Sequence, residues 1–102
     1  MWDKKGKILS IENLTDQMVS HVLGPTILLR DNSIRIFFSS RNEQNQSYPY
    51  YLDVEKDNPL SIKHIEKKPL LELGSLGAFD DDGVMPCSVV RLDDQTVYLY
   101  YI

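Results

Sequence analysis

Short runs of apolar and β-branched residues, separated by polar turns, recur along most of the chain. Such runs are typical of β-strands and not of helices. The predicted strands are residues 27–30, 34–39, 48–54, 60–66, 87–91 and 97–102. The triplets "DNS" at 31–33 and "DDQ" at 93–95 supply tight turns. Only residues 10–23 hold a helix signal, a turn or two capped by Ser10.

An internal repeat organises these strands. The stretches "PTILLRDNSIRIFF" and "PCSVVRLDDQTVYLYY" share a plan of Pro, apolar strand, Arg, acidic turn and aromatic strand. Pro25 and Pro86 stand 61 residues apart, and Arg30 and Arg91 keep the same offset. An antiparallel four-stranded unit that repeats at this spacing is typical of a propeller blade. The chain is therefore predicted to be all-β, with about one and a half blades.

The repeat also sets the expected organisation of the chain. Residues 1–24 form an N-terminal segment, 25–68 the first blade, and 69–102 a connection and the first half of a second blade. Residues 26–66 are predicted to form one four-stranded antiparallel sheet, and residues 87–102 two strands of the next. Because "VYLYYI" ends without a turn or polar tail, we interpret the sequence as an N-terminal fragment of a larger protein.

Composition narrows the class of protein without identifying it. Apolar residues make up 42% and charged residues 25% of the chain, which are ordinary globular values. The net charge of −4 argues against a nucleic-acid partner. No apolar run has the length of a membrane span or of a signal peptide, so no membrane partner and a cytoplasmic location are expected. The single cysteine, Cys87, is expected to be a small buried hydrophobic residue.

The order of several stretches resembles the five-bladed β-propeller glycosidase-like superfamily. They are "SHVLGP", "IRIFFSSR", "YLDVEKDNP", "KKPLLELGSLGAFDDDGVMP" and "VYLYYI". The superfamily includes glycoside hydrolase families 43, 32, 62 and 68 and the family 130 phosphorylases. The chain is most similar to a bacterial branch of glycosyl hydrolases. The resemblance covers essentially the whole chain, and "FDDDGVMP…YLYYI" is its most specific part.

The resemblance implies a central funnel with acidic residues at its mouth. In the superfamily an Asp typically precedes Pro where the first strand of a blade begins, but Gly24 and Met85 occupy these two positions. The usual acids therefore cannot be carried over. The run "FDDDGV" remains, and the resemblance places its Asp80 and Asp82 on the funnel side of the second blade.

Asp80 and then Asp82 are the candidate catalytic residues. Glycoside cleavage needs two carboxyl groups, one protonated and one ionised, and crowding of like charges favours protonation of one of them. On an extended chain Asp80 and Asp82 would share one side and Asp81 would face away. The alternative is a solvated turn closed by an Asx-type side-chain bond. The run lacks the further ligands of a calcium loop, so no metal and no cofactor are expected.

His21 and Arg41 are the candidate substrate-binding residues. His21 precedes the first predicted strand, and Arg41 follows the second, where it could bind a sugar hydroxyl, a carboxylate or a phosphate. A surface or core His and a solvated Arg are the alternatives. Inner strands of neighbouring blades converge, so His21, Arg41 and Asp80 are predicted to approach one another at one end of the sheets. The other aromatic and imidazole side chains are expected to pack or to lie on the surface: Trp2, Tyr48, Tyr50, Tyr51 and His64.

These observations favour a glycosidase that hydrolyses a carbohydrate substrate, with at least one catalytic carboxyl group beyond residue 102. Two alternatives stay open. One is a glycoside phosphorylase, with His21 and Arg41 binding phosphate. The other is a non-catalytic carbohydrate-binding propeller, which Gly24 and Met85 support. The 102 residues alone are expected to be inactive and to self-associate through the exposed last strand.

Overall fold

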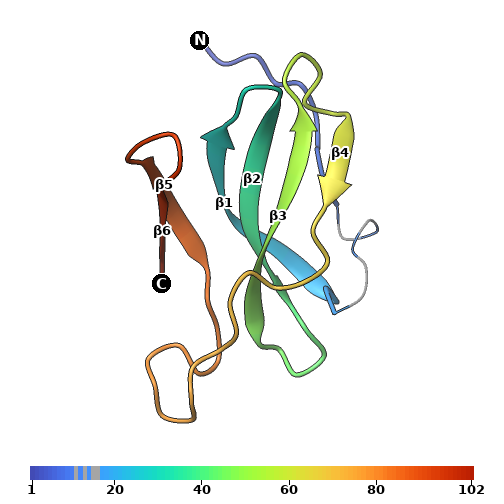
Figure 1. Cartoon of the computed structure of the whole chain (residues 1–102). Helices are drawn as coiled ribbons and strands as arrows, with labels where there is room; N and C mark the ends of the chain where they lie inside the picture. The colour runs from blue at the N-terminus through green and yellow to red at the C-terminus, as the bar shows by residue number, and fades with distance from the viewer. Residues whose placement is uncertain (11, 13, 15–16) are drawn as a thin grey trace.

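The described part of the chain is built from β-strands. The computed structural model describes every residue except 11, 13, 15 and 16, and it contains no α-helix within that part. Six strands follow one another along the chain (Figure 1). They are β1 (Ser20–Leu29), β2 (Ser33–Arg41), β3 (Ser47–Glu55), β4 (Ile62–Ile65), β5 (Pro86–Arg91) and β6 (Val97–Tyr101). The predicted all-β class is confirmed.

β1 to β4 form one antiparallel sheet in the order of the sequence, and β5 and β6 form a second, two-stranded sheet. The predicted division into sheets is therefore confirmed. Local polar contacts close the turns. Arg30 donates its backbone N–H to the Ser33 carbonyl at 2.9 Å, and the Asn42 side chain accepts from the backbone N–H groups of Gln44 and Gln46 at 3.0 Å each.

The main core lies on one face of the first sheet. Alternating positions of β2 and β3 point to this face, because successive side chains of a strand point to opposite sides. The fully buried side chains there are Phe38, Tyr50, Leu52 and Val54. Met18 joins them, and partly buried side chains of the N-terminal segment, Ile8, Leu9 and Leu14, pack against them. The expectation that Tyr50 packs in the core is confirmed.

The two sheets meet along β1 and β5, the first strand of each. A Cβ atom on Gly24 would lie 2.7 Å from Met85 Cγ and 2.9 Å from the Pro86 carbonyl oxygen. At the other end, the Arg91 guanidinium donates to the Leu29 carbonyl at 2.9 Å. β1 and β5 therefore run side by side in the same direction, with the 61- to 62-residue offset of the sequence repeat (Figure 1). The two halves of the sequence repeat therefore correspond to strands that hold the same position, the first, in their two sheets.

The beginning of β1 differs from the sequence prediction. The strand begins at Ser20, so residues 20–24 belong to the sheet and not to the N-terminal segment. Two irregularities interrupt its pairing with β2, between Ser20 and Leu23 and between Leu23 and Thr26. Each contains one residue with positive φ, His21 at 66° and Gly24 at 61°. These bulges break the alternation on which strand prediction depends.

Three further expectations can be compared with the structure. Trp2 is 96% exposed, so the expectation that it packs is wrong. Cys87 is also exposed, so the expectation that it is a buried hydrophobic residue is wrong. The helical turns expected within residues 10–23 fall partly outside the described residues, and the end of that range is strand. Within the described part of the chain, no helix has the length and apolar character needed to cross a membrane.

Candidate functional site

Strand ends and loops that are distant in the sequence come together at one end of the first sheet. The register pairs Ser20 with Arg41 and Arg41 with Ser47, and Ser47 forms a parallel bridge with Gly83. We call this end of the sheet, defined by Ser20, Arg41 and Ser47, the site end. The loop that carries the three consecutive acids lies at the same end (Figure 1). The sequence-predicted residues His21, Arg41, Asp80 and Asp82 therefore all belong to this region.

Backbone hydrogen bonds attach the acidic loop to the sheet. Ser47 donates its N–H to the Asp82 carbonyl at 3.1 Å, and Val84 donates to the Ser47 carbonyl at 2.9 Å. The Ser39 hydroxyl, which is buried, donates to the Val84 carbonyl at 3.1 Å. The acidic loop is therefore held by β2 and β3 as well as by its own chain.

The three acids have three different environments. Asp81 accepts a hydrogen bond from the Gly77 N–H at 2.7 Å and closes the loop on itself. Asp80 is partly buried, and the Tyr101 hydroxyl donates to its carboxylate at 3.4 Å. The Asp82 side chain is exposed. The turn alternative thus describes Asp81, whereas Asp80 and Asp82 keep carboxylate oxygens available.

The extended backbone expected around Asp80 and Asp82 is not found. Residues 79–82 form turns and bends, so these two side chains do not share a strand face. Asp80 lies against Gly74, whose N–H donates to the Asp80 carbonyl at 3.1 Å, and a Cβ atom on Gly74 would overlap the Asp80 carboxylate. Gly74 therefore leaves the space that the Asp80 side chain occupies.

Arg41 ends β2 with a guanidinium that is only partly satisfied. Its Nη1 donates to the Asn45 side-chain oxygen at 3.1 Å. Its Nε is buried and has no hydrogen-bond partner among the described residues. Arg41 therefore retains hydrogen-bonding capacity at the site end.

His21 is exposed and lies within β1, not before it. Its Nδ1 lies 2.8 Å from the Ser20 hydroxyl. The buried Ser40 hydroxyl in turn donates to the Ser20 carbonyl at 2.9 Å, which ties the start of β1 to β2. Among the described residues, His21, Arg41 and Asp80 share one end of the sheet but make no direct hydrogen bond or ion pair with one another.

His21 adopts a left-handed backbone conformation, with φ of 66°. Residues other than glycine rarely adopt this conformation. Strained residues of this kind are concentrated at functional sites. We expect His21→Gly to raise the free energy of unfolding by up to about 1 kcal/mol, because glycine adopts this conformation without a steric penalty. His21→Val should lower it by about 1 kcal/mol or more. Urea unfolding measures both; a loss of stability in His21→Gly would show that the imidazole stabilises the fold.

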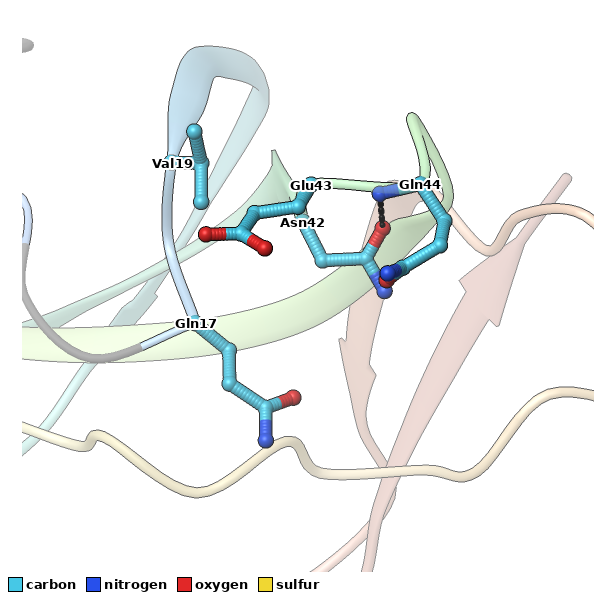
Figure 2. Close-up of a pocket in the computed structure, with 5 residues that line it drawn as sticks. All are labelled: Gln17, Val19, Asn42, Glu43 and Gln44. Atoms are coloured by element: carbon cyan, nitrogen blue, oxygen red, sulfur yellow. Dashed lines mark hydrogen bonds between the residues drawn. The ribbon is translucent and has the colours of Figure 1, made fainter.

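A small polar hollow also lies at the site end. Its volume is about 330 Å³, and Figure 2 shows the five side chains that line it. They are Gln17, Val19, Asn42, Glu43 and Gln44. The Val19 N–H donates to the Arg41 carbonyl at 2.8 Å, so the hollow adjoins Arg41 through the backbone. Amide and carboxylate groups suit the hydroxyl groups of a sugar.

Sequence reasoning missed this hollow and the two buried serines. The hollow joins residues 17–19 with the polar loop 42–44, and only the β1–β2 pairing brings these segments together. Ser39 and Ser40 resemble the polar end of a strand, yet both are buried, with 1% exposure. The position of "SS" directly before Arg41 was the only available signal.

The other strong polar contact of the first sheet lies away from the site end. Arg35 and Asp53, cross-strand partners in β2 and β3, form two hydrogen bonds of 2.9 and 3.0 Å. The Arg35 guanidinium also lies 3.9 Å from the centroid of the Tyr51 ring. The hydrogen bonds from Arg35 hold the pKa of Asp53 below its ordinary value of 3.8.

This pair predicts a pH dependence of stability. Because the pKa of Asp53 is lower in the folded state, the pair stabilises the fold above pH ~4, and this contribution is lost as the pH falls further. Asp53→Asn should lower the free energy of unfolding by about 1–2 kcal/mol at pH 7, and by less at pH 3. Asp57→Asn, at an exposed turn position, serves as the control. Equal losses at both pH values in Asp53→Asn would contradict the assignment.

No group of His, Cys, Asp and Glu side chains that could hold a metal ion occurs among the residues that the structure describes. The site end carries carboxylate, amide and guanidinium groups. Its chemistry is suited to binding a polyhydroxylated or anionic ligand.

Comparisons with known proteins identify relatives but no activity. Two proteins of Mycobacterium tuberculosis are homologous to the chain, uncharacterized protein MT1551 of strain CDC 1551 and uncharacterized protein Rv1502 of strain H37Rv. Each is 37% identical over 101 residues, which cover 98% of this chain. No family model and no solved structure matches the chain. The matched region covers 33% of each relative, so the chain spans about a third of the length of these relatives.

Proposed function

We propose that the chain forms the first one and a half blades of a five-bladed propeller that hydrolyses glycosidic bonds. The observation that carries this proposal is the packing of β1 against β5. Each is the first strand of its sheet, and they lie side by side with the offset of the sequence repeat. Neighbouring blades of a propeller meet in this way around the central axis.

The length of the relatives supports the number of blades. The 101 matched residues are 33% of each relative. The distance from Pro25 to Pro86 is 61 residues, and a repeat of this length fits about five times into such a protein. A propeller of that size is consistent with the resemblance in the sequence.

Within this proposal, Asp80 is the first catalytic candidate. Asp80 is partly buried at the site end. Its carboxylate accepts a hydrogen bond from the Tyr101 hydroxyl and occupies the space that Gly74 leaves free. The exposed Asp82 is the second. A carboxyl group from a later blade would stand across the scissile bond. In an inverting reaction one carboxyl group protonates the leaving oxygen and the other activates water. His21 and Arg41 would bind the substrate.

A non-catalytic carbohydrate-binding propeller is the second candidate, and one observation favours it. Gly24 stands where the superfamily has an Asp before Pro. Its φ of 61° and its close approach to Pro86 leave no room for a side chain. One acid of the usual set is therefore missing from this blade for a structural reason.

Turnover by a full-length relative tests the proposal. Purified Rv1502 protein would be incubated with a panel of oligosaccharides and aryl glycosides, with and without inorganic phosphate. We expect sugar release without phosphate. Asn at the position that matches Asp80 should lower turnover by about 10²–10⁴-fold, the usual contribution of a general acid or base.

The matched control is Asn at the position of Asp81, whose side chain closes the loop, and it should retain much more activity. Turnover that requires phosphate would instead indicate a phosphorylase. Saturable binding without turnover would indicate the binding-only propeller. Neither binding nor turnover with any member of the panel would reject the carbohydrate proposal.

A further inference from the structure

A second cleft lies between the two sheets, towards the end opposite the site end. Its inner part has a volume of about 530 Å³ and is lined mainly by apolar side chains of both sheets, among them Leu28, Phe37, Val97 and Leu99. Leu71, from the connection between the sheets, adds to this lining. Volumes of this size are typical of small-molecule sites.

The mouth of this cleft is polar. A hollow of about 400 Å³ adjoins the apolar part, and the two share Arg30, Arg91 and Asp94. These residues follow β1, end β5 and lie in the β5–β6 turn, respectively. Arg30 and Arg91 occupy equivalent positions of the two repeats. The side-by-side packing of β1 and β5 therefore places the two arginines at one mouth.

Both guanidinium groups retain N–H donors that no described residue uses. Arg91 uses one nitrogen to donate to the Leu29 carbonyl at 2.9 Å. The Arg30 guanidinium makes no hydrogen bond or ion pair with the described residues. Five N–H donors in a planar fork make a guanidinium well suited to a carboxylate.

The unused guanidinium donors and two nearby lysines favour an anion at the mouth. Asp31 and Asp94 line it and oppose the two arginines. Lys56 and Lys63 reach the backbone carbonyls of Asp31 and Asn32, at 3.4 and 3.5 Å, and bring two more positive charges to the same turn. The two arginines and two aspartates that line the mouth balance in charge, and the two lysines add positive charge beside it.

We propose that this cleft binds an amphipathic monoanion, a saturated carboxylate with a chain of roughly eight to twelve carbons. The carboxylate lies between Arg30 and Arg91, and the alkyl chain lies between the sheets against Leu28, Phe37 and Leu99. This inference does not depend on the carbohydrate function, because Asp80, Asp82, His21 and Arg41 do not line the cleft; Tyr101, which donates to Asp80, lines it but is not needed to hold the carboxylate.

Isothermal titration of the 102-residue chain with sodium hexanoate, octanoate and decanoate tests the proposal. Each added methylene should tighten binding by up to about fourfold, because it is removed from water. Decylamine has the same chain and the opposite charge, so it should bind at least tenfold more weakly than decanoate. Arg30→Gln combined with Arg91→Gln should weaken decanoate binding at least tenfold.

Two controls separate this site from loss of structure and from net charge. Lys67→Gln combined with Lys68→Gln removes two exposed cations elsewhere and should leave decanoate binding unchanged. Arg30→Gln alone keeps the bond from Arg91 to Leu29 and should still weaken binding severalfold. Equal binding of decylamine, no effect of the arginine substitutions, or no saturable binding at millimolar decanoate would each overturn the proposal.

Discussion

Replacing Gly24 by alanine should destabilise the chain by roughly 2–5 kcal/mol, because it strains the backbone of β1 and forces β1 and β5 apart. At φ of 61° any side chain is strained. The new Cβ would also stand 2.7 Å from Met85 Cγ and 2.9 Å from the Pro86 carbonyl oxygen. Pro86 is buried and paired with β6, so its backbone has little freedom to move.

Urea unfolding at one fixed protein concentration measures this effect, and Gly77→Ala is the matched control. Gly77 also has a positive φ, 91°, but a Cβ atom there would meet nothing within 4 Å. Its substitution should therefore cost only the backbone strain, about 1–2 kcal/mol. If Gly24→Ala cost no more than Gly77→Ala, the close packing of the two sheets would be contradicted.

The chain in isolation should associate into dimers or larger species at micromolar concentration. β6 pairs with β5 on one edge only, so its other edge presents unpaired backbone groups, as edge strands do. Tyr98 and Tyr100 on this strand are 51% and 52% exposed. We propose that a second copy of the chain pairs with this edge.

Sedimentation velocity tests the association. Tyr98→Lys combined with Tyr100→Lys should convert the chain to a monomer, because charged residues on an edge strand oppose pairing. Leu60→Lys combined with Leu76→Lys makes the same change of charge at exposed positions away from β6, and this control should still associate. A native chain that sediments as a monomer with a cooperative melt would contradict the proposed open edge.

Much of the fold follows from local sequence signals. The β-branched and aromatic run of β2, the alternation in the later part of β3 and the turn triplets at 31–33 and 93–95 predict the strands, because these signals lie within each segment. The repeat from Pro25 to Pro86 goes further and predicts which strands are equivalent. The beginning of β1 could not be predicted, since its bulges at His21 and Gly24 interrupt the alternation.

The sequence predicts where the candidate site lies, but not how its side chains are arranged. The three adjacent acids were a clear signal, yet their separate environments depend on residues far along the chain. Tyr101 orients Asp80, and Ser47 holds the backbone of Asp82. Neither contact can be predicted from the residues that neighbour Asp80 in the sequence. The same is true of Ser39, whose burial arises only from the approach of Val84.

A crystal structure of full-length Rv1502 protein would show directly whether the chain is part of a propeller. We predict about five antiparallel sheets around one axis, with the equivalents of β1 and β5 adjacent to that axis. The carboxylate that matches Asp80 should face the central channel, with a second carboxylate from a later sheet roughly 5–10 Å away. A separate helical domain outside the matched third, or an Asp80 equivalent on the outer rim, would contradict the propeller.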